Sequence, residues 1–100
     1  MNEKTGSEVT GVDRLRNRYR VVEWDSCGNE HIVALTDDNL VGTANTTTRR
    51  DGLFDVHCSI QDEGNEHLHS AVSIEGFDSA EEAIEAGADW INSNMEAGGF

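Results

Sequence analysis

The sequence is short of several residue types and patterns, and each shortage excludes a class of protein. Two cysteines, Cys27 and Cys58, are too few for the disulfide framework of a small secreted domain. No apolar run is long enough to span a membrane, and residues 1–13 are polar, with no apolar signal-peptide segment. We therefore expect a cytoplasmic protein whose 100 residues form one small domain.

The motifs that carry common enzyme chemistry are also missing. The chain contains no glycine-rich phosphate loop, no G-x-S-x-G nucleophile elbow and no H-E-x-x-H zinc-binding helix. Carboxylates are abundant, but Glu23 beside His31 fits a cross-strand ion pair better than a general acid and base. The sequence thus predicts a protein that is not an enzyme and that needs no cofactor.

Lysine is the scarcest charged residue, and acidic residues dominate. Twenty aspartates and glutamates oppose seven basic residues, of which only Lys4 is a lysine, and the net charge is −13. This composition is typical of proteins from salt-loving archaea, where dissolved salt screens the repulsion that would destabilise a compact state. A DNA mimic is the alternative, but the acidic residues are scattered over turns and one helix face and do not form two rows.

The few basic residues are concentrated near the N-terminus. Residues 1–20 hold five basic and three acidic residues, a net charge of +2, whereas residues 21–100 hold two basic and seventeen acidic residues, a net charge of −15. Alternating arginines would project from one face of an extended segment. With two further arginines they would form a strip that binds nucleic acid or another anion; the six are Arg14, Arg16, Arg18, Arg20, Arg49 and Arg50. The competing interpretation is that they neutralise the acidic body.

The strongest helix signal lies near the C-terminus. Over residues 79–96, apolar and small residues recur at steps of three or four, and acidic residues occupy the opposite face. Ser79 followed by Glu82 is a capping-box pattern that marks the start. Gly87 lies on the apolar stripe, where glycine costs about 1 kcal/mol relative to alanine. Its position indicates that the helix approaches a strand closely there.

The preceding residues have the pattern of two similar β-hairpins. The tetrapeptide Gly-Asn-Glu-His occurs at 28–31 and again at 64–67. Each glycine is expected to close a three-residue loop, Ser26-Cys27-Gly28 in the first hairpin and Asp62-Glu63-Gly64 in the second. This register would place the even-numbered residues of both hairpins on the face that the helix covers.

A further strand at 41–48 completes the expected fold. The expected fold is α+β: a four- or five-stranded antiparallel β-meander with one C-terminal α-helix packed on one face. The domain is expected to span residues 14–97, between a flexible N-terminal arm at 1–13 and a flexible tail at 98–100.

The junction between the last strand and the helix reads Gly-Phe-Asp-Ser-Ala-Glu-Glu-Ala, at residues 76–83. With its flanking segments, over residues 53–95, it resembles small sheet-plus-helix modules, including arm-type DNA-binding domains and HicB-like antitoxins. The chain has no proline, so the Pro-Gly element usual in HicB-like chains is missing. The resemblance implies only that strands run into a helix here.

The face of the sheet opposite the helix is expected to be apolar in the first hairpin. Under the predicted register it carries Tyr19, Val21, Val33 and Leu35. Because one helix cannot cover both faces, the N-terminal arm, a second copy or another protein should cover this patch. We therefore favour a module that self-associates or binds a protein through the patch, as a homodimer that weakens when salt is lowered.

The second hairpin suggests a further alternative on the same face. The predicted register puts His57 opposite His69, with His67 diagonal to His57. Three imidazoles within reach would suit a metal-binding domain that holds zinc. An ordinary polar sheet face is the simpler interpretation, because no fourth ligand stands at a recognisable spacing.

Overall fold

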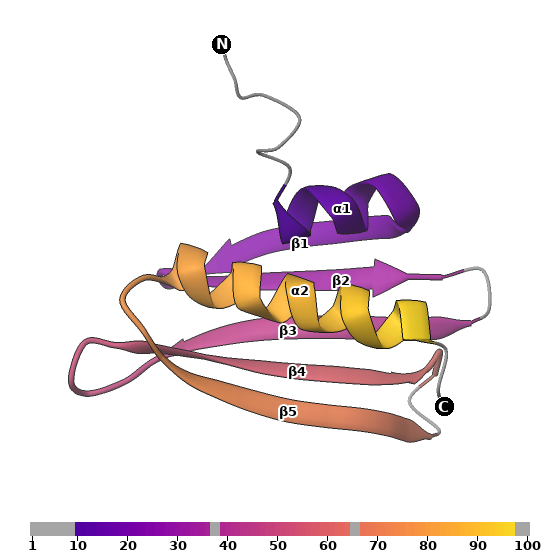
Figure 1. The fold of residues 1–100 in the computed structure, drawn as a ribbon. Helices are drawn as coiled ribbons and strands as arrows, with labels where there is room; N and C mark the ends of the chain where they lie inside the picture. The colour runs from indigo at the N-terminus through magenta and orange to yellow at the C-terminus, as the bar shows by residue number, and fades with distance from the viewer. Residues whose placement is uncertain (1–9, 37–38, 65–66, 98–100) are drawn as a thin grey trace, which may run out of the picture.

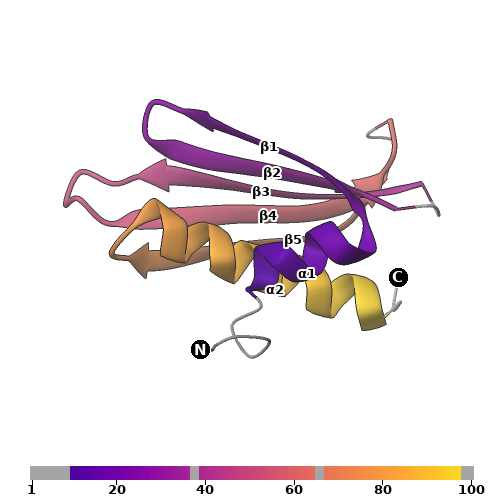
Figure 2. The ribbon, with the colours of Figure 1, turned by 90° about the horizontal axis from the view of Figure 1, so that it is seen from above.

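The computed structural model describes residues 10–36, 39–64 and 67–97. The elements in chain order are α1 (Gly11–Arg18), β1 (Arg20–Ser26), β2 (Asn29–Leu35), β3 (Leu40–Thr48), β4 (Phe54–Asp62), β5 (Leu68–Phe77) and α2 (Ala80–Ala97). The strands form one antiparallel sheet in the order β1-β2-β3-β4-β5, and both helices lie on the same face of it (Figures 1 and 2). The predicted α+β meander with a C-terminal helix is confirmed. Within the described ranges, no helix is long and apolar enough to cross a membrane.

Helix α2 forms where its sequence pattern predicts. The Oγ atom of Ser79 accepts a hydrogen bond from the backbone N–H of Glu82 at 3.1 Å and so caps the helix. A Cβ atom at Gly87 would lie 2.9 Å from Ala44 Cβ and 2.9 Å from Val56 Cγ2. The close approach of helix to sheet that the sequence indicated is therefore present, and it depends on a residue without a side chain.

The core lies between the sheet and α2. Even-numbered residues of the three central strands supply it: Ile32, Ala34, Ala44, Val56, Cys58 and Ile60 are buried. For β2 and β4 this is the face that the sequence predicts. The helix contributes Ala83, Ile84, Ala88 and Ile91.

The register of the first hairpin differs from the prediction by one residue. Its loop has two residues, Cys27 and Gly28, with φ angles of 53° and 83°. Positive φ at both positions is the type I′ turn, which matches the twist of a two-residue hairpin. Val22 therefore lies opposite Val33, whereas the predicted three-residue loop would place it opposite Ile32. Since a slip of one residue moves every side chain of a strand to the other face, Val22 lies on the face away from the helices.

The register of the second hairpin also differs from the prediction. Cys58 lies opposite Val72 and His57 opposite Ser73, whereas the predicted three-residue loop would place them opposite Leu68 and His69. The pairing of β4 with β5 contains two irregularities, one between Phe54 and Val56 and one between Ile60 and Gln61. The pair nearest the turn is Gln61 and Leu68, so the connection between the strands is longer than the predicted three-residue loop.

Helix α1 is the element that the sequence analysis missed. The segment with alternating arginines is helical from Gly11 and not extended. Thr10 and Asp13 form a capping box, in which Asp13 N donates to Thr10 Oγ1 at 3.0 Å and Thr10 N donates to Asp13 Oδ2 at 3.4 Å. Residues 11–13 thus belong to the folded part and not to the arm. The rest of the predicted arm, 1–9, and the predicted tail, 98–100, lie outside the described residues.

Helix α1 packs on the polar face of α2. The carboxylate of Glu85 accepts the backbone N–H of Gly11 at 2.8 Å, and Asn92 Nδ2 donates to the carbonyl oxygen of Gly11 at 2.9 Å. Arg14 pairs with Asp89 at 2.7 Å. Asn92, which lies on the face of α2 opposite its apolar stripe, is consequently only 3% exposed.

Candidate interaction surface

The outer face of the first hairpin, away from both helices, carries exposed apolar side chains. Arg20 lies opposite Leu35, Val22 opposite Val33, and Trp24 opposite His31. Val22 is 50% exposed and Trp24 is 46% exposed. We call Val22, Trp24, Val33 and Leu35 the hairpin patch.

The hairpin patch shares only half of its members with the patch predicted from the sequence. Val33 and Leu35 lie on the outer face as expected, but Tyr19 and Val21 are partly buried against the core. Val22 and Trp24 take their places because of the one-residue difference in register. The signal that would have found them is Cys27-Gly28 as a two-residue loop.

Trp24 is held in a defined position on this face. Its ring stacks on that of His31, with centroids 5.2 Å apart and an angle of 12° between the planes. The other side of the imidazole is fixed by Asn45, whose Oδ1 accepts a hydrogen bond of 2.8 Å from His31 Nδ1. His31 Nε2 is buried and has no hydrogen-bond partner among the described residues. The indole therefore stands on a rigid base, as an anchor of an interface requires.

The outer face becomes polar beyond the first hairpin. The hydroxyls of Thr43 and Ser59 are hydrogen-bonded across β3 and β4 at 2.8 Å. His57 contacts Thr47 Oγ1 at 3.1 Å through Nε2 and Ser73 Oγ at 2.8 Å through Nδ1. These side chains satisfy one another, so the middle of the outer face is largely polar. Exposed Leu68 lies beyond it on β5, apart from the hairpin patch.

Acidic residues are distributed unevenly between the two faces of the sheet. Of the outward-facing positions in β1 to β4, Asp55 alone carries a carboxylate, and Arg49 Nη1 approaches it at 3.6 Å. The helix side of the first hairpin carries Glu23, Asp25 and Glu30. Burial, followed by repulsion from Asp25, raises the pKa of Glu30 above its usual value. The hairpin patch thus lies on the side of the sheet that holds little negative charge.

The arginine strip predicted from the sequence is not formed. Arg14, Arg16 and Arg18 lie on α1, Arg20 lies on β1, and Arg49 and Arg50 follow β3. Arg16 binds both carboxylate oxygens of Glu23, at 2.7 and 2.8 Å, and these hydrogen bonds raise its pKa further. Arg49 pairs with Asp51 at 3.0 Å. These pairings support the competing interpretation, in which arginines neutralise the acidic body.

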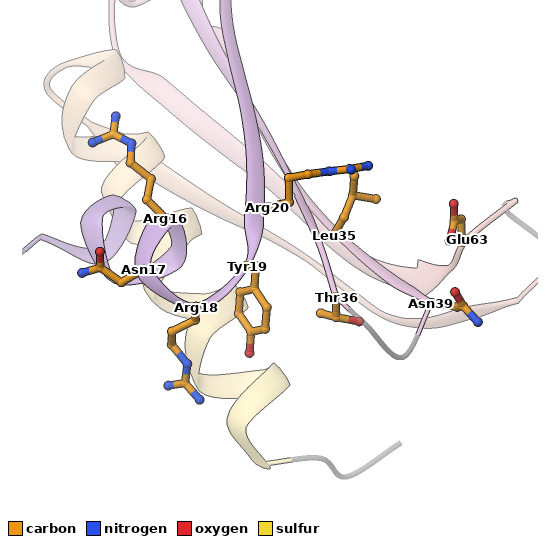
Figure 3. A pocket seen from close by; sticks show the side chains of 9 residues that line it. All are labelled: Arg16, Asn17, Arg18, Tyr19, Arg20, Leu35, Thr36, Asn39 and Glu63. Carbon is orange, nitrogen blue, oxygen red and sulfur yellow. The ribbon is translucent and has the colours of Figure 1, made fainter.

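An open groove of about 650 Å³ lies where the end of α1 meets the turn between β2 and β3 (Figure 3). Arg18, Tyr19 and Arg20 stand on one side of it, and Thr36 and Asn39 on the other. Among its described lining residues, three arginines, Arg16, Arg18 and Arg20, stand with one carboxylate, that of Glu63.

The histidines are not brought together as predicted. His57 faces Ser73, and His69 Nε2 lies 2.8 Å from Asp62 Oδ1. His67 and His69 contact each other edge to face, with ring centroids 4.7 Å apart. In the part of the chain that the structure describes, no group of three or more His, Cys, Asp or Glu side chains is placed to hold a metal ion. The predicted juxtaposition of His57 and His69 is wrong, because the register of β4 and β5 differs.

Comparison with known proteins adds no family to this description. No family model matches the chain, and neither a curated protein nor a solved structure is significantly similar to it.

Proposed function

We propose that the protein is a non-enzymatic interaction module that associates with a second copy of itself through the first hairpin. The observation that supports this proposal is the hairpin patch. Val22 and Trp24 are about half exposed on a sheet face that no described element covers. Exposed apolar side chains that adjoin one another are typical of association sites, whereas isolated ones are ordinary.

Charge favours a second copy over a nucleic acid. The net charge of −13 repels a polyanion, and Arg14, Arg16 and Arg49 already pair with carboxylates. The hairpin patch brings almost no carboxylates to a contact with its own copy, so the acidic helix sides remain apart. Their remaining repulsion is screened over about 10 Å at 0.1 M salt and about 3 Å at 1 M. Association should therefore strengthen as salt rises.

Sedimentation at several salt concentrations tests this proposal. We expect the wild type to be a dimer at molar salt and to dissociate progressively at low salt. Val22→Glu should remain folded and monomeric, because it places a charge in the hairpin patch without changing the core. The matched control is Ala71→Glu, which adds the same charge on the same face near the opposite edge of the sheet and should still dimerise.

Two results would contradict self-association. One is a wild type that stays monomeric at every salt concentration. The other is tight binding of a single-stranded oligonucleotide that is lost steeply with salt, which would indicate phosphate contacts by arginines.

A further inference from the structure

The two edge strands of the sheet differ in how well they are protected against further pairing. β5 pairs with β4 through two register irregularities, and such bulges blunt an edge. β1 pairs with β2 in unbroken register over its whole length and contains neither proline nor lysine. Its acidic residues Glu23 and Asp25 point to the helix side, and Arg16 neutralises Glu23. β1 therefore lacks the bulge, proline and lysine that protect many edges, and its protection rests on its charged side chains alone.

The turn type shows which backbone groups of β1 face away from the sheet. A two-residue hairpin loop is flanked by a hydrogen-bonded pair, here Ser26 and Asn29. Even-numbered residues of β1 thus direct their N–H and C=O groups to β2, and Val21, Glu23 and Asp25 direct theirs outward. Figure 2 looks onto this edge, and α1 lies on the helix side of the sheet, joined to the start of β1 and packed beside it.

We propose that the edge of β1 pairs in antiparallel fashion with β1 of a second copy, with Val22 on the two-fold axis. This inference rests on the proposed self-association and specifies its geometry. Antiparallel strands that are related by a two-fold axis place one residue opposite its own copy. The sequence of β1, Arg-Val-Val-Glu-Trp-Asp-Ser, decides which residue that is.

Val22 is the residue that makes the pairing self-complementary. With Val22 on the axis, Arg20 lies opposite Trp24 of the second copy and Val21 lies opposite Glu23. Arg20 and Trp24 are both on the outer face, where a guanidinium and an indole attract each other.

The other registers are less favourable. Glu23 on the axis would place two carboxylates face to face, and Trp24 on the axis would place Glu23 opposite Asp25. Val21 on the axis would leave Trp24 beyond the end of the opposing strand, because the chain before Arg20 turns into α1.

The pairing gives the exposed apolar side chains of β1 a partner. Val21 of one copy and Glu23 of the other exchange backbone hydrogen bonds. The two Val22 residues form a non-hydrogen-bonded pair, in which their side chains meet. The two sheets become one continuous sheet, in which the two hairpin patches adjoin across the axis. Each half-exposed Trp24 gains a contact with Arg20 of the other copy.

Cysteine cross-linking tests the register directly. In a Cys27→Ser background, Val22→Cys should form a disulfide-linked dimer with oxidised glutathione at molar salt. The Cα atoms of a non-hydrogen-bonded pair are about 4.5 Å apart, which a disulfide spans. The control Val33→Cys lies on the next strand, so its two copies would be separated by three strand spacings, about 14 Å, and should not cross-link. Equal cross-linking of both variants would overturn the edge pairing.

A proline substitution tests the backbone hydrogen bonds. Glu23→Pro removes an outward N–H without removing a bond to β2. It should weaken the dimer about 5- to 150-fold, because one backbone hydrogen bond is lost in each copy. The control Glu23→Ala also loses the carboxylate but keeps the N–H, and it should dimerise like the wild type.

These experiments separate the two proposals. A wild type that is monomeric at every salt concentration overturns both. A wild type that dimerises, together with Glu23→Pro that dimerises equally well and Val22→Cys that does not cross-link, overturns the edge pairing alone. Self-association through the outer face would then stand.

Discussion

The two faces of one sheet have opposite characters in this protein. The helix side is closed, with Val56 and Ile60 fully buried, and its rim carries acidic side chains such as Glu23 and Glu30. The outer side is open and carries few carboxylates, and Trp24 is half exposed on it. A strongly acidic composition thus does not imply an evenly acidic surface. The face that carries few acidic residues is the one that can approach another molecule of the same charge.

The largest expected effect is on stability, and it compares a buried residue on the helix side of the sheet with an exposed residue on the outer face. Ile60→Ala should lower the free energy of unfolding by about 2 to 5 kcal/mol, because it leaves a cavity under α2. Leu68→Ala on the outer face, where Leu68 is 57% exposed, should cost less than about 1 kcal/mol. Urea denaturation of the two variants measures both changes. Equal losses would mean that the outer face is covered even in the monomer.

A second variant tests whether α1 belongs to the closed side. Leu15 is fully buried, so Leu15→Ala should destabilise the protein by about 2 kcal/mol or more, within the range for buried leucines. Arg14→Ala removes only an exposed ion pair with Asp89 and should cost about 0 to 1 kcal/mol. Thermal denaturation compares the two. If Leu15→Ala behaved like Arg14→Ala, α1 would not be part of the cooperative unit.

Glu30 allows the acidic rim to be tested by pH. Burial and the neighbouring carboxylates raise its pKa in the folded protein above the usual 4.5, so its ionised form disfavours folding at neutral pH. This cost is relieved as pH falls, because the folded state takes up the proton first. Glu30→Gln should therefore raise the urea midpoint at pH 7 and give no gain below about pH 4.5. A gain of the same size at both pH values would assign the effect to packing.

The two cysteines report on the same contrast without any substitution. Burial raises the pKa of Cys58 to about 11, so its thiol stays protonated beneath α2, whereas Cys27 is exposed in the turn between β1 and β2. At pH 8 a disulfide reagent such as dithionitrobenzoate should modify one thiol in the native protein and two in denaturant. Rapid reaction of both thiols in the native protein would indicate that the closed side opens readily.

The sequence by itself determined the elements that carry a strong period. The 3.6-residue pattern over residues 79–96, the Ser79 cap and Gly87 on the apolar stripe identified α2 and its close approach to the sheet. The hairpin pattern identified the even-numbered residues of β2 and β4 as the core face. An apolar patch on the outer face of the first hairpin also followed from the pattern.

Only the tertiary structure decided the registers and the N-terminal helix. The members of the hairpin patch depend on whether Ser26 belongs to the loop or to the strand, and Cys27 adopts a positive φ that side-chain-bearing residues seldom adopt. An eight-residue helix is marginal in isolation, so α1 depends on Glu85 and Asn92, more than seventy residues away. Those contacts turn the alternating arginines from a predicted anion-binding strip into partners of nearby carboxylates. The local sequence pattern determines which segments form helices and strands. Loop geometry and long-range contacts determine on which face of its element each side chain lies.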